Sequence, residues 1–318
     1  MVDANPENYF TRIRAMLVNK TFRTSRYKAM VKTESGKRRD ILKLPYFPDR
    51  IVHHCIVQVL EPTWNKSLIR DTYACIPGRG IHDGVRRIQE TLRDREGTAY
   101  CLKMDVRKFY PSIDHDILKS ILRRKIKDQD VLDLLDEVID SSEGGIPIGN
   151  YLSQHFGNLY LSGYDHWMKE TQQCRYYFRY CDDVVVLDSS KERLHELRLR
   201  TREYWAERLK VSLKENWQVF PVAVRGIDFL GYRFFPGYTL LRKRTALRFK
   251  RKMARIKRDW LRMKPVSVLS TVMSYEGWLR HANCLHLKKA HIGQEVQNIV
   301  TELSQAMNIQ NPLRRCVL

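Results

Sequence analysis

The spacing of hydrophobic and polar positions divides the chain into a mixed part and a helical part. Short apolar runs that predict strands occur at 99–106, 174–190 and 217–237. Stretches with the 3.6-residue spacing of a helix occur at 115–139 and 191–210. From about residue 240 onward the spacing is helical, with Pro265 as a break. The pattern predicts an α+β fold, a lobe of its own for the first 95 residues, and a separate C-terminal helical lobe.

The first element of that helical lobe, residues 241–264, is strongly basic. It holds 12 Lys and Arg against one Asp. On a helix, its apolar residues form one stripe: Phe249, Met253, Ile256, Trp260 and Met263. The opposite side carries Arg248, Arg251, Arg255, Arg258 and Arg262. A charge run is usually a solvated helix face, but an arginine stripe with so few acids favours contact with phosphates.

Composition and charge narrow the class of protein. The chain has 318 residues, enough for two or three packed lobes, and 43% of them are hydrophobic. An excess of 57 Lys and Arg over 36 Asp and Glu gives a net charge of +21, which indicates a polyanionic partner, nucleic acid first. The seven cysteines contain no CxxC pair, so they suggest neither a disulfide framework nor a zinc site. Without a membrane span or a secretory signal pattern, we expect a cytosolic protein with no membrane partner.

Acidic residues gather at two places in this basic chain, each beside a predicted strand. Asp105 ends an apolar run, and Asp182 and Asp183 lie between the runs YYFRY and VVVL. For the second place alone, the tight turn of a hairpin is an equally good explanation, since Asp tolerates turn geometry. Carboxylates that converge from neighbouring strands repel one another unless a cation is present, and their hard oxygens suit Mg²⁺. The three acids together predict a two-metal phosphoryl-transfer site.

These acids belong to a longer ordered set of segments. The set comprises SGKRRDILKLPYFPDRIVHHCIVQVLEP (35–62), TYACIPGRGIHDGV (72–85), MDVRKFYPSID (104–114), IPIGNYLSQHFGNLYL (146–161), YCDD (180–183) and DFLGYRF (228–234). In this order they resemble the fingers motifs, the first and middle palm motifs, the YxDD motif and the primer grip of a reverse transcriptase. The lineage that they resemble is the bacterial, group II intron-like one.

The resemblance implies a right-hand polymerase fold, in which an antiparallel palm sheet carries the acids. The implied divisions are fingers (1–95), palm (96–115), a helical insertion between fingers and palm (116–144), palm with the YCDD hairpin and primer grip (145–238), and a helical thumb (239–318). The implied activity is RNA-directed DNA polymerisation.

Residue roles follow from the same resemblance. It implies catalytic roles for Asp105, Asp182 and Asp183, the last supporting the site from the turn. It implies Asp105, Val106 and Asp182 as ligands of two Mg²⁺ ions, for which Mn²⁺ can substitute. It places Lys37, Arg38 and Arg39 over the nucleotide triphosphate and Tyr110 against the sugar. It places Ile148, Gly149, Gln154 and Lys214 near the nucleotide, and it assigns to the primer grip Phe229, Leu230, Gly231 and Tyr232.

Two of these roles have ordinary structural alternatives. Tyr110 lies where an aromatic ring blocks a ribose 2′-hydroxyl in the family, but a half-buried packing aromatic is the alternative. Lys214 resembles the lysine on the pyrophosphate side of the site, and a surface lysine explains it equally well.

The middle motif and the chain's compactness bear on the biological role. Ile148 stands where many family members have Gln, and the pattern IGNxxSQ is similar to that of diversity-generating retroelement enzymes and some defence-associated reverse transcriptases. We expect a defence enzyme, with class 2 as the nearest group, that copies a dedicated structured noncoding RNA into cDNA from dNTPs. A diversity-generating enzyme, which would work with an accessory protein, and a retron enzyme are the alternatives. The alternative of another class is a non-catalytic RNA-binding protein on a polymerase scaffold, although such a scaffold has no electrostatic reason to keep three converging acids.

Overall fold

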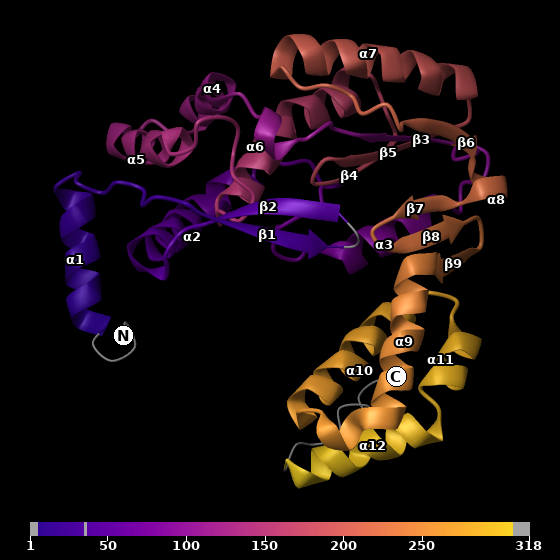
Figure 1. Ribbon diagram of the computed structural model, residues 1–318. Coiled ribbons are helices and arrows are strands. Elements are labelled where there is room, and N and C mark those ends of the chain that lie inside the picture. Colours follow the sequence, from indigo (N-terminus) through magenta and orange to yellow (C-terminus); the bar gives the residue numbers. More distant parts are fainter. Residues whose placement is uncertain (1–5, 35–36, 308–318) are drawn as a thin grey trace. The chain divides into compact units, whose positions relative to one another are not determined.

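The computed structural model describes residues 6–34 and 37–307, apart from a few side chains beside the internal gap (Figure 1). These residues fall into two compact units. The first contains the chain up to Gly80 and Tyr100–Val219, and the second contains Ile81–Ala99 and the chain from Phe220.

A small antiparallel sheet forms the framework of the first unit. Its strand order is β4-β5-β3-β6, and the chain passes into the second unit within β6. The strands are β3 (Tyr100–Asp105), β4 (Tyr176–Tyr180), β5 (Asp183–Asp188) and β6 (Gln218–Pro221). The predicted strand at 99–106 and the predicted β-rich stretch at 174–190 are both confirmed. The apolar centre of strand β5 is buried, and an aspartate lies at each end of the strand.

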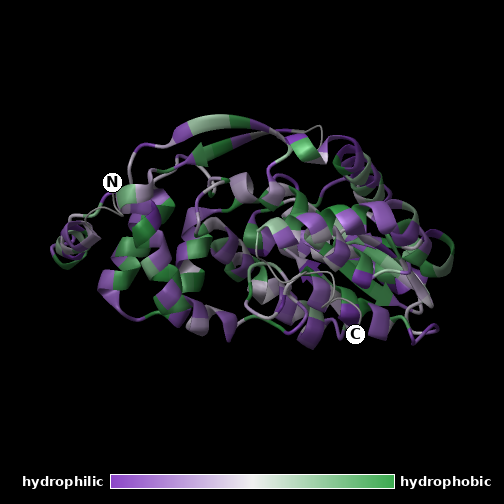
Figure 2. Ribbon diagram, turned by 90° about the horizontal axis from the view of Figure 1, so that it is seen from below, coloured by the Kyte–Doolittle hydropathy of each residue, from purple (hydrophilic) through white to green (hydrophobic). Residues whose placement is uncertain are grey.

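Helices pack around this sheet according to their apolar residues. Helix α6 (Ser153–His166) is buried around nearly its whole circumference, whereas α7 (Lys191–Leu209) buries a single stripe against β3 and β5 (Figure 1). That stripe consists of Leu194, Leu197, Thr201, Trp205 and Leu209. The other elements of the unit include α1 (Pro6–Val18), the hairpin β1 (Lys28–Glu34) and β2 (Lys37–Lys43), a π-helical turn (Tyr46–Arg50), α2 (Ile51–Asn65), α4 (His115–Lys125) and α5 (Gln129–Asp140). Figure 2 shows hydrophilic and hydrophobic residues alternating along the helices, as expected for elements that bury one face.

The predicted helical stretch 115–139 is two helices instead of one. Helix α4 ends at Lys125, where Ile126 takes an extended conformation. Helix α5 then begins after Asp128, whose side chain accepts a hydrogen bond from the backbone nitrogen of Val131. An aspartate that caps the second helix explains the break, because its carboxylate replaces the missing intrahelical acceptor.

The second unit combines a three-stranded antiparallel sheet with a helical bundle. The sheet order is β7-β8-β9. The elements are α3 (Ile81–Thr91), α8 (Val222–Arg225), β7 (Ile227–Phe229), β8 (Tyr232–Phe235), β9 (Tyr238–Leu241), α9 (Lys243–Asp259), α10 (Pro265–Arg280), α11 (Leu285–His291) and α12 (Gln294–Ala306). The helical C-terminal part is confirmed, while the β-rich stretch 217–237 also contains the short helix α8. The finer division into fingers, palm, insertion and thumb stays a prediction.

The predicted basic helix is shorter than its apolar spacing indicated. Helix α9 ends at Asp259, and a 3-10 turn, Trp260–Arg262, follows it. Phe249, Met253 and Ile256 are buried as expected, whereas Trp260 and Met263 are only partly buried. The buried apolar stripe therefore ends at Ile256. Among the described residues, none of the helices combines the length and apolar character that crossing a bilayer would need.

Candidate active site

Three aspartates come together where strand β3 ends and strand β5 begins. Asp105 is the last residue of β3 and lies directly opposite Asp183, the first residue of β5. Asp182 precedes it, in the turn that joins β4 to β5. The prediction that the two acid-bearing strands lie side by side is confirmed. The placement of Asp183 in the turn was wrong, because its backbone already pairs within the sheet.

The carboxylates of this cluster interact strongly with one another. Burial, a hydrogen bond with Asp105 and repulsion from the charge of Asp105 together raise the pKa of Asp182 to about 7. Two carboxyl groups that share a proton in this way lie close together. Two carboxylates so close to each other are stable only with a proton or a cation between them.

Two lysines from neighbouring segments offset the remaining charge. The Nζ atom of Lys214 lies 2.6 Å from Oδ2 of Asp105, and the Nζ atom of Lys103 lies 3.3 Å from Oδ2 of Asp183. Lys214 is held there by its backbone nitrogen, which donates to the carbonyl oxygen of Asp105 at 3.0 Å. This contact favours the site over the surface as the environment of Lys214. Sequence reasoning missed Lys103, although its position two residues before Asp105 on a strand places it on the same face.

The donor chemistry of the cluster fits a hard divalent cation. Asp105 and Asp182 offer carboxylate oxygens whose mutual repulsion a cation would relieve, as Mg²⁺ sites require. Val106 follows with a buried side chain and a backbone bridge to Leu213, so only its main-chain carbonyl could serve as a ligand. Within the described parts of the chain, no group of three or more His, Cys, Asp or Glu side chains is arranged to hold a metal ion. A metal ion here would be held by Asp105, Asp182 and the carbonyl of Val106, with water or substrate completing its ligands.

A buried ion pair supports the turn that carries Asp182. Arg179 and Asp165 are both fully buried, and Nε of Arg179 donates to Oδ1 of Asp165 at 2.7 Å. Burial alone would lower the pKa of Arg179, but the charge and hydrogen bonds of Asp165 raise it. Tyr177 donates its hydroxyl to Asp165 at 2.5 Å, and Nη1 of Arg179 donates to the carbonyl oxygen of Cys181 at 2.9 Å. The pair thus holds the backbone of the turn directly before Asp182.

This ion pair also escaped the sequence analysis. Its signal was present as a single arginine within the apolar strand YYFRY and a single aspartate within the apolar helix α6. Charged residues in buried elements are rare unless they are paired, so each of the two charges predicts an oppositely charged partner.

Tyr110 lies beside the YCDD turn. Burial raises the pKa of its hydroxyl well above the usual range, and Cys181 and Asp182 act in the same direction. Its ring packs against Phe109 at a centroid distance of 5.2 Å. A Cβ atom at Gly157 would lie 3.3 Å from the Tyr110 ring, so helix α6 approaches it closely. Tyr110 therefore lies beside Asp182 and also packs within the unit, and its role as a sugar gate stays a prediction.

The segment around Ile148 and Gly149 lies against strand β2. The backbone nitrogen of Leu42 donates to the carbonyl oxygen of Ile148 at 2.9 Å. Gly149 has a φ of +112°, and a Cβ there would lie 2.7 Å from Cγ2 of Ile41, so only glycine fits. The structure therefore places 148–149 against Ile41 and Leu42 of β2, the strand that also carries the predicted nucleotide-binding residues 37–39.

The side chains of that second segment are only partly described. Lys37, Arg38 and Arg39 all lie on β2, and Arg38 is exposed. The side chains of Lys37 and Arg39 lie outside the described part of the structure. Gln154, at the start of α6, is exposed and accepts a hydrogen bond from Sγ of Cys75.

The predicted primer grip belongs to the second unit. Phe229 and Tyr232 end β7 and begin β8, and Leu230 and Gly231 form the turn between them with φ values of +50° and +84°. The side chains of Phe229, Leu230 and Tyr232 are buried, and Tyr232 stacks on Trp278 at 5.1 Å. A nucleic acid at this hairpin would therefore meet backbone rather than these side chains.

The predicted basic stripe is exposed on the second unit. The five arginines are Arg248, Arg251, Arg255, Arg258 and Arg262, the last in the turn after α9. Arg258 pairs with the neighbouring Asp259 at 2.9 Å. Arg251 and Arg255 make no ion pair with any described residue, so their charge is available to a phosphate.

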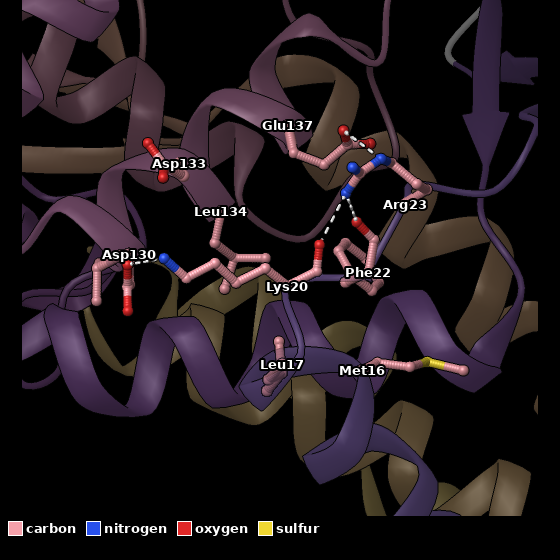
Figure 3. Close-up of a pocket in the computed structure, with 10 residues that line it drawn as sticks. Met16, Leu17, Lys20, Phe22, Arg23, Asp130, Asp133, Leu134 and Glu137 are labelled. Atoms are coloured by element: carbon pink, nitrogen blue, oxygen red, sulfur yellow. Dashed lines mark hydrogen bonds and ion pairs between the residues drawn. The ribbon is translucent and has the colours of Figure 1, made fainter.

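A separate cavity of about 230 Å³ lies between α1 and α5 in the first unit (Figure 3). Its apolar lining includes Leu17 and Leu134, and none of the predicted site residues lines it. Most of its charged residues form ion pairs within the chain, since Lys20 pairs with Asp130 and Arg23 pairs with Glu137 (Figure 3). This cavity has no part in the chemistry of the aspartate cluster.

Known proteins resemble this chain both in sequence and in fold. A family model described as reverse transcriptase (RNA-dependent DNA polymerase) matches residues 30–234. Protein YkfC of Escherichia coli K12 is 24% identical over 255 residues, which cover 66% of this chain and 65% of YkfC. The group II intron-encoded protein LtrA of Lactococcus lactis subsp. cremoris is 22% identical over 145 residues, 42% of this chain and 24% of LtrA. The chain thus spans less than two thirds of either relative.

The solved structures that resemble this chain do so in fold, at low sequence identity. Apo telomerase from Candida tropicalis aligns with a TM-score of 0.59 at 11% identity, over 95% of this chain and 63% of the telomerase. The same enzyme in complex with a TWJ fragment of telomeric RNA aligns with a TM-score of 0.57 at 11% identity, over 93% of this chain and 56% of that one. The predicted α+β, right-hand polymerase fold class is confirmed.

Proposed function

Since the chain belongs to the reverse transcriptase family, we propose that it extends a primer with deoxynucleotides along an RNA template. One observation carries this proposal: Asp105, Asp182 and Asp183 converge at the junction of β3 and β5. The repulsion between Asp105 and Asp182 costs stability, so packing alone does not explain why these acids lie together. Such a cluster serves chemistry that develops charge on phosphate oxygens.

We propose Mg²⁺ as the cofactor, held in two positions by Asp105, Asp182 and the carbonyl of Val106, with Mn²⁺ able to substitute. When bound, the ions would supply the positive charge that activates the attacking oxygen and stabilises the leaving one. Lys103 holds Asp183 in place through its ion pair. Lys214 lies within reach of phosphate oxygens that would come to Asp105. Tyr110 fills the space beside Asp182 where a sugar would lie.

Primer extension on an RNA template tests this function directly. The wild-type protein should incorporate deoxynucleotides only with Mg²⁺ or Mn²⁺, and Asp182→Ala with Asp183→Ala should abolish incorporation because carboxylate ligands are lost. Asp116→Ala, an exposed acid of α4, is the matched control and should remain active. Unaltered thermal unfolding of the double variant would show that it is folded. Strong extension by that double variant would overturn the proposal.

For the biological role, we propose that the enzyme copies a dedicated structured noncoding RNA into cDNA in anti-phage defence. Support comes from the IGNYLSQ and YCDD motifs and from the net charge of +21, which suits a large RNA partner. Diversity-generating retroelement and retron enzymes are the alternatives, and the first would add an accessory protein. Sequencing the RNA and DNA that co-purify with the protein distinguishes them. One recurrent noncoding RNA with its complementary cDNA supports the defence reading, whereas cDNA of a protein-coding template repeat contradicts it.

A further inference from the structure

A polar surface pocket in the second unit has no part in the function proposed above. It lies between the end of α3 and strand β9, and its volume is about 400 Å³. Arg93, Arg95, Tyr238, Gln89 and Asn283 line it. All of these residues belong to the second unit, so the pocket is complete within one compact body. We refer to it as the Arg93 pocket.

The charged side chains that line the Arg93 pocket are positive. Arg93 and Arg95 are both exposed, no acid lines the pocket, and neither arginine makes an ion pair with any described residue. Asp94, which lies between them in sequence, accepts a hydrogen bond from the backbone nitrogen of Gly97 at 2.9 Å. Two guanidinium groups beside one cavity favour an anion, and their planar donors suit phosphate oxygens.

An aromatic platform forms another wall of the same pocket. Phe235 and Tyr238 stack with a centroid distance of 4.7 Å and an interplanar angle of 13°. Tyr238 is 45% exposed, so its ring still offers surface to a ligand. Gly237 has a φ of +95°, and a Cβ there would lie 3.9 Å from Nη2 of Arg95. The turn therefore places a guanidinium group close to the stacked rings.

The polar floor of the pocket is fixed by its own hydrogen bonds. Nε2 of Gln89 donates to Oγ1 of Thr239 at 3.0 Å and to the carbonyl oxygen of His281 at 3.1 Å. The backbone nitrogen of Thr239 donates to Oδ1 of Asn283 at 2.8 Å. These bonds hold the side-chain amides of Gln89 and Asn283, both of which line the pocket, in fixed orientations. Such fixed groups lower the entropic cost of binding.

We infer that the Arg93 pocket binds a nucleotide of single-stranded RNA, with its phosphate on Arg93 and Arg95 and its base stacked on Tyr238. Phosphate-binding arginines beside an open aromatic face are the combination with which proteins hold unpaired RNA. The inference rests on the proposed function, because it assumes that RNA is the partner. The pocket contains no acid that could hold a metal, so it would anchor RNA rather than take part in the chemistry.

Cross-linking of a short RNA to the full chain tests this inference at the pocket itself. The probe is an unstructured 12-nucleotide RNA that carries 4-thiouridine, and peptide mapping locates the cross-links. We expect a cross-link in 235–238 that is lost in Arg93→Ala with Arg95→Ala and weakened in Arg93→Lys with Arg95→Lys, which keeps the charge but not the planar donors. Arg280→Ala with Lys289→Ala removes two exposed charges of the same unit outside the pocket and should leave the cross-link unchanged.

Affinity for the same RNA provides a second measurement. Tyr238→Ala should weaken binding at the pocket by about 5- to 150-fold, the range for loss of one stacked base, while Tyr238→Phe should bind as the parent does. Absence of a cross-link in 235–238, or equal loss in the charge control, would overturn the inference.

Primer extension on a short preformed duplex separates this inference from the proposed function. Pocket variants should extend that duplex as the parent does. A parent that cross-links at the pocket yet fails to extend would contradict the proposed function alone.

Discussion

Replacing Asp165 by Asn should destabilise the first unit by about 3–5 kcal/mol, the range for breaking a buried ion pair. Both partners are fully buried, so the variant leaves the charge of Arg179 without a counterion in the interior. The Asp165 carboxylate accepts from Nε and Nη2 of Arg179 at 2.7 and 2.5 Å, and from the Tyr177 hydroxyl at 2.5 Å. An Asn side chain has one acceptor oxygen instead of two, so at least one of these donors loses its partner.

Thermal unfolding followed by circular dichroism measures this loss. The first unit has roughly 200 residues, for which 1 kcal/mol shifts Tm by about 2–4 °C, so we expect a fall of roughly 6–20 °C. Asp165→Leu with Arg179→Met removes both charges and should recover most of the lost stability, since an apolar pair avoids the desolvation cost. A fall of less than about 2 °C for Asp165→Asn would refute the reasoning.

The same pair should matter for catalysis beyond its effect on stability. Arg179 donates to the carbonyl oxygen of Cys181, one residue before Asp182, so it positions the turn that holds a catalytic carboxylate. The folded double apolar variant lacks that hydrogen bond. We expect it to need more Mg²⁺ for half-maximal extension, with about tenfold lower kcat, because the carboxylate is less well placed. Normal kcat and Mg²⁺ dependence in this variant would restrict the pair to a purely structural role.

Three further predictions concern other parts of the chain. Burial lowers the pKa of His53 to about 4, so the unfolded state takes up a proton first as the pH falls, and stability is lost between about pH 6.5 and about pH 4. Between pH 7.5 and 5, the Tm of His53→Leu should therefore fall by less than the Tm of the parent. Tyr110→Val should raise the use of ribonucleotides over deoxynucleotides in single-nucleotide competition, and an unchanged ratio would leave only packing. Arg251, Arg255 and Arg258 changed to Glu should lower the log–log salt slope of RNA binding by about 0.7 per lost phosphate contact, whereas equal slopes would indicate a solvated face.

Local spacing was sufficient to predict the strands within 99–106 and 174–190 and the helical C-terminal part, but it did not predict the hairpin of β1 and β2. Asp105 could be placed at a strand end because an apolar run followed by an acid marks where a buried strand meets solvent, whereas Asp183 was expected in the turn and instead begins β5. Spacing was less reliable at boundaries. The break at Asp128 and the early end of α9 at Asp259 both depend on capping and packing that hydrophobic periodicity does not record.

The sequence by itself determined which residue types were available for chemistry, and the tertiary structure decided which of them meet. Lys103 and Asp183 pair across two strands, and Arg179 and Asp165 pair between a strand and a helix. The Arg93 pocket joins α3 to a strand that follows it by more than a hundred residues. These partners are distant along the chain, so no local period or motif connects them. Their contacts arise only when the packing of whole elements brings the side chains within a few ångströms of each other.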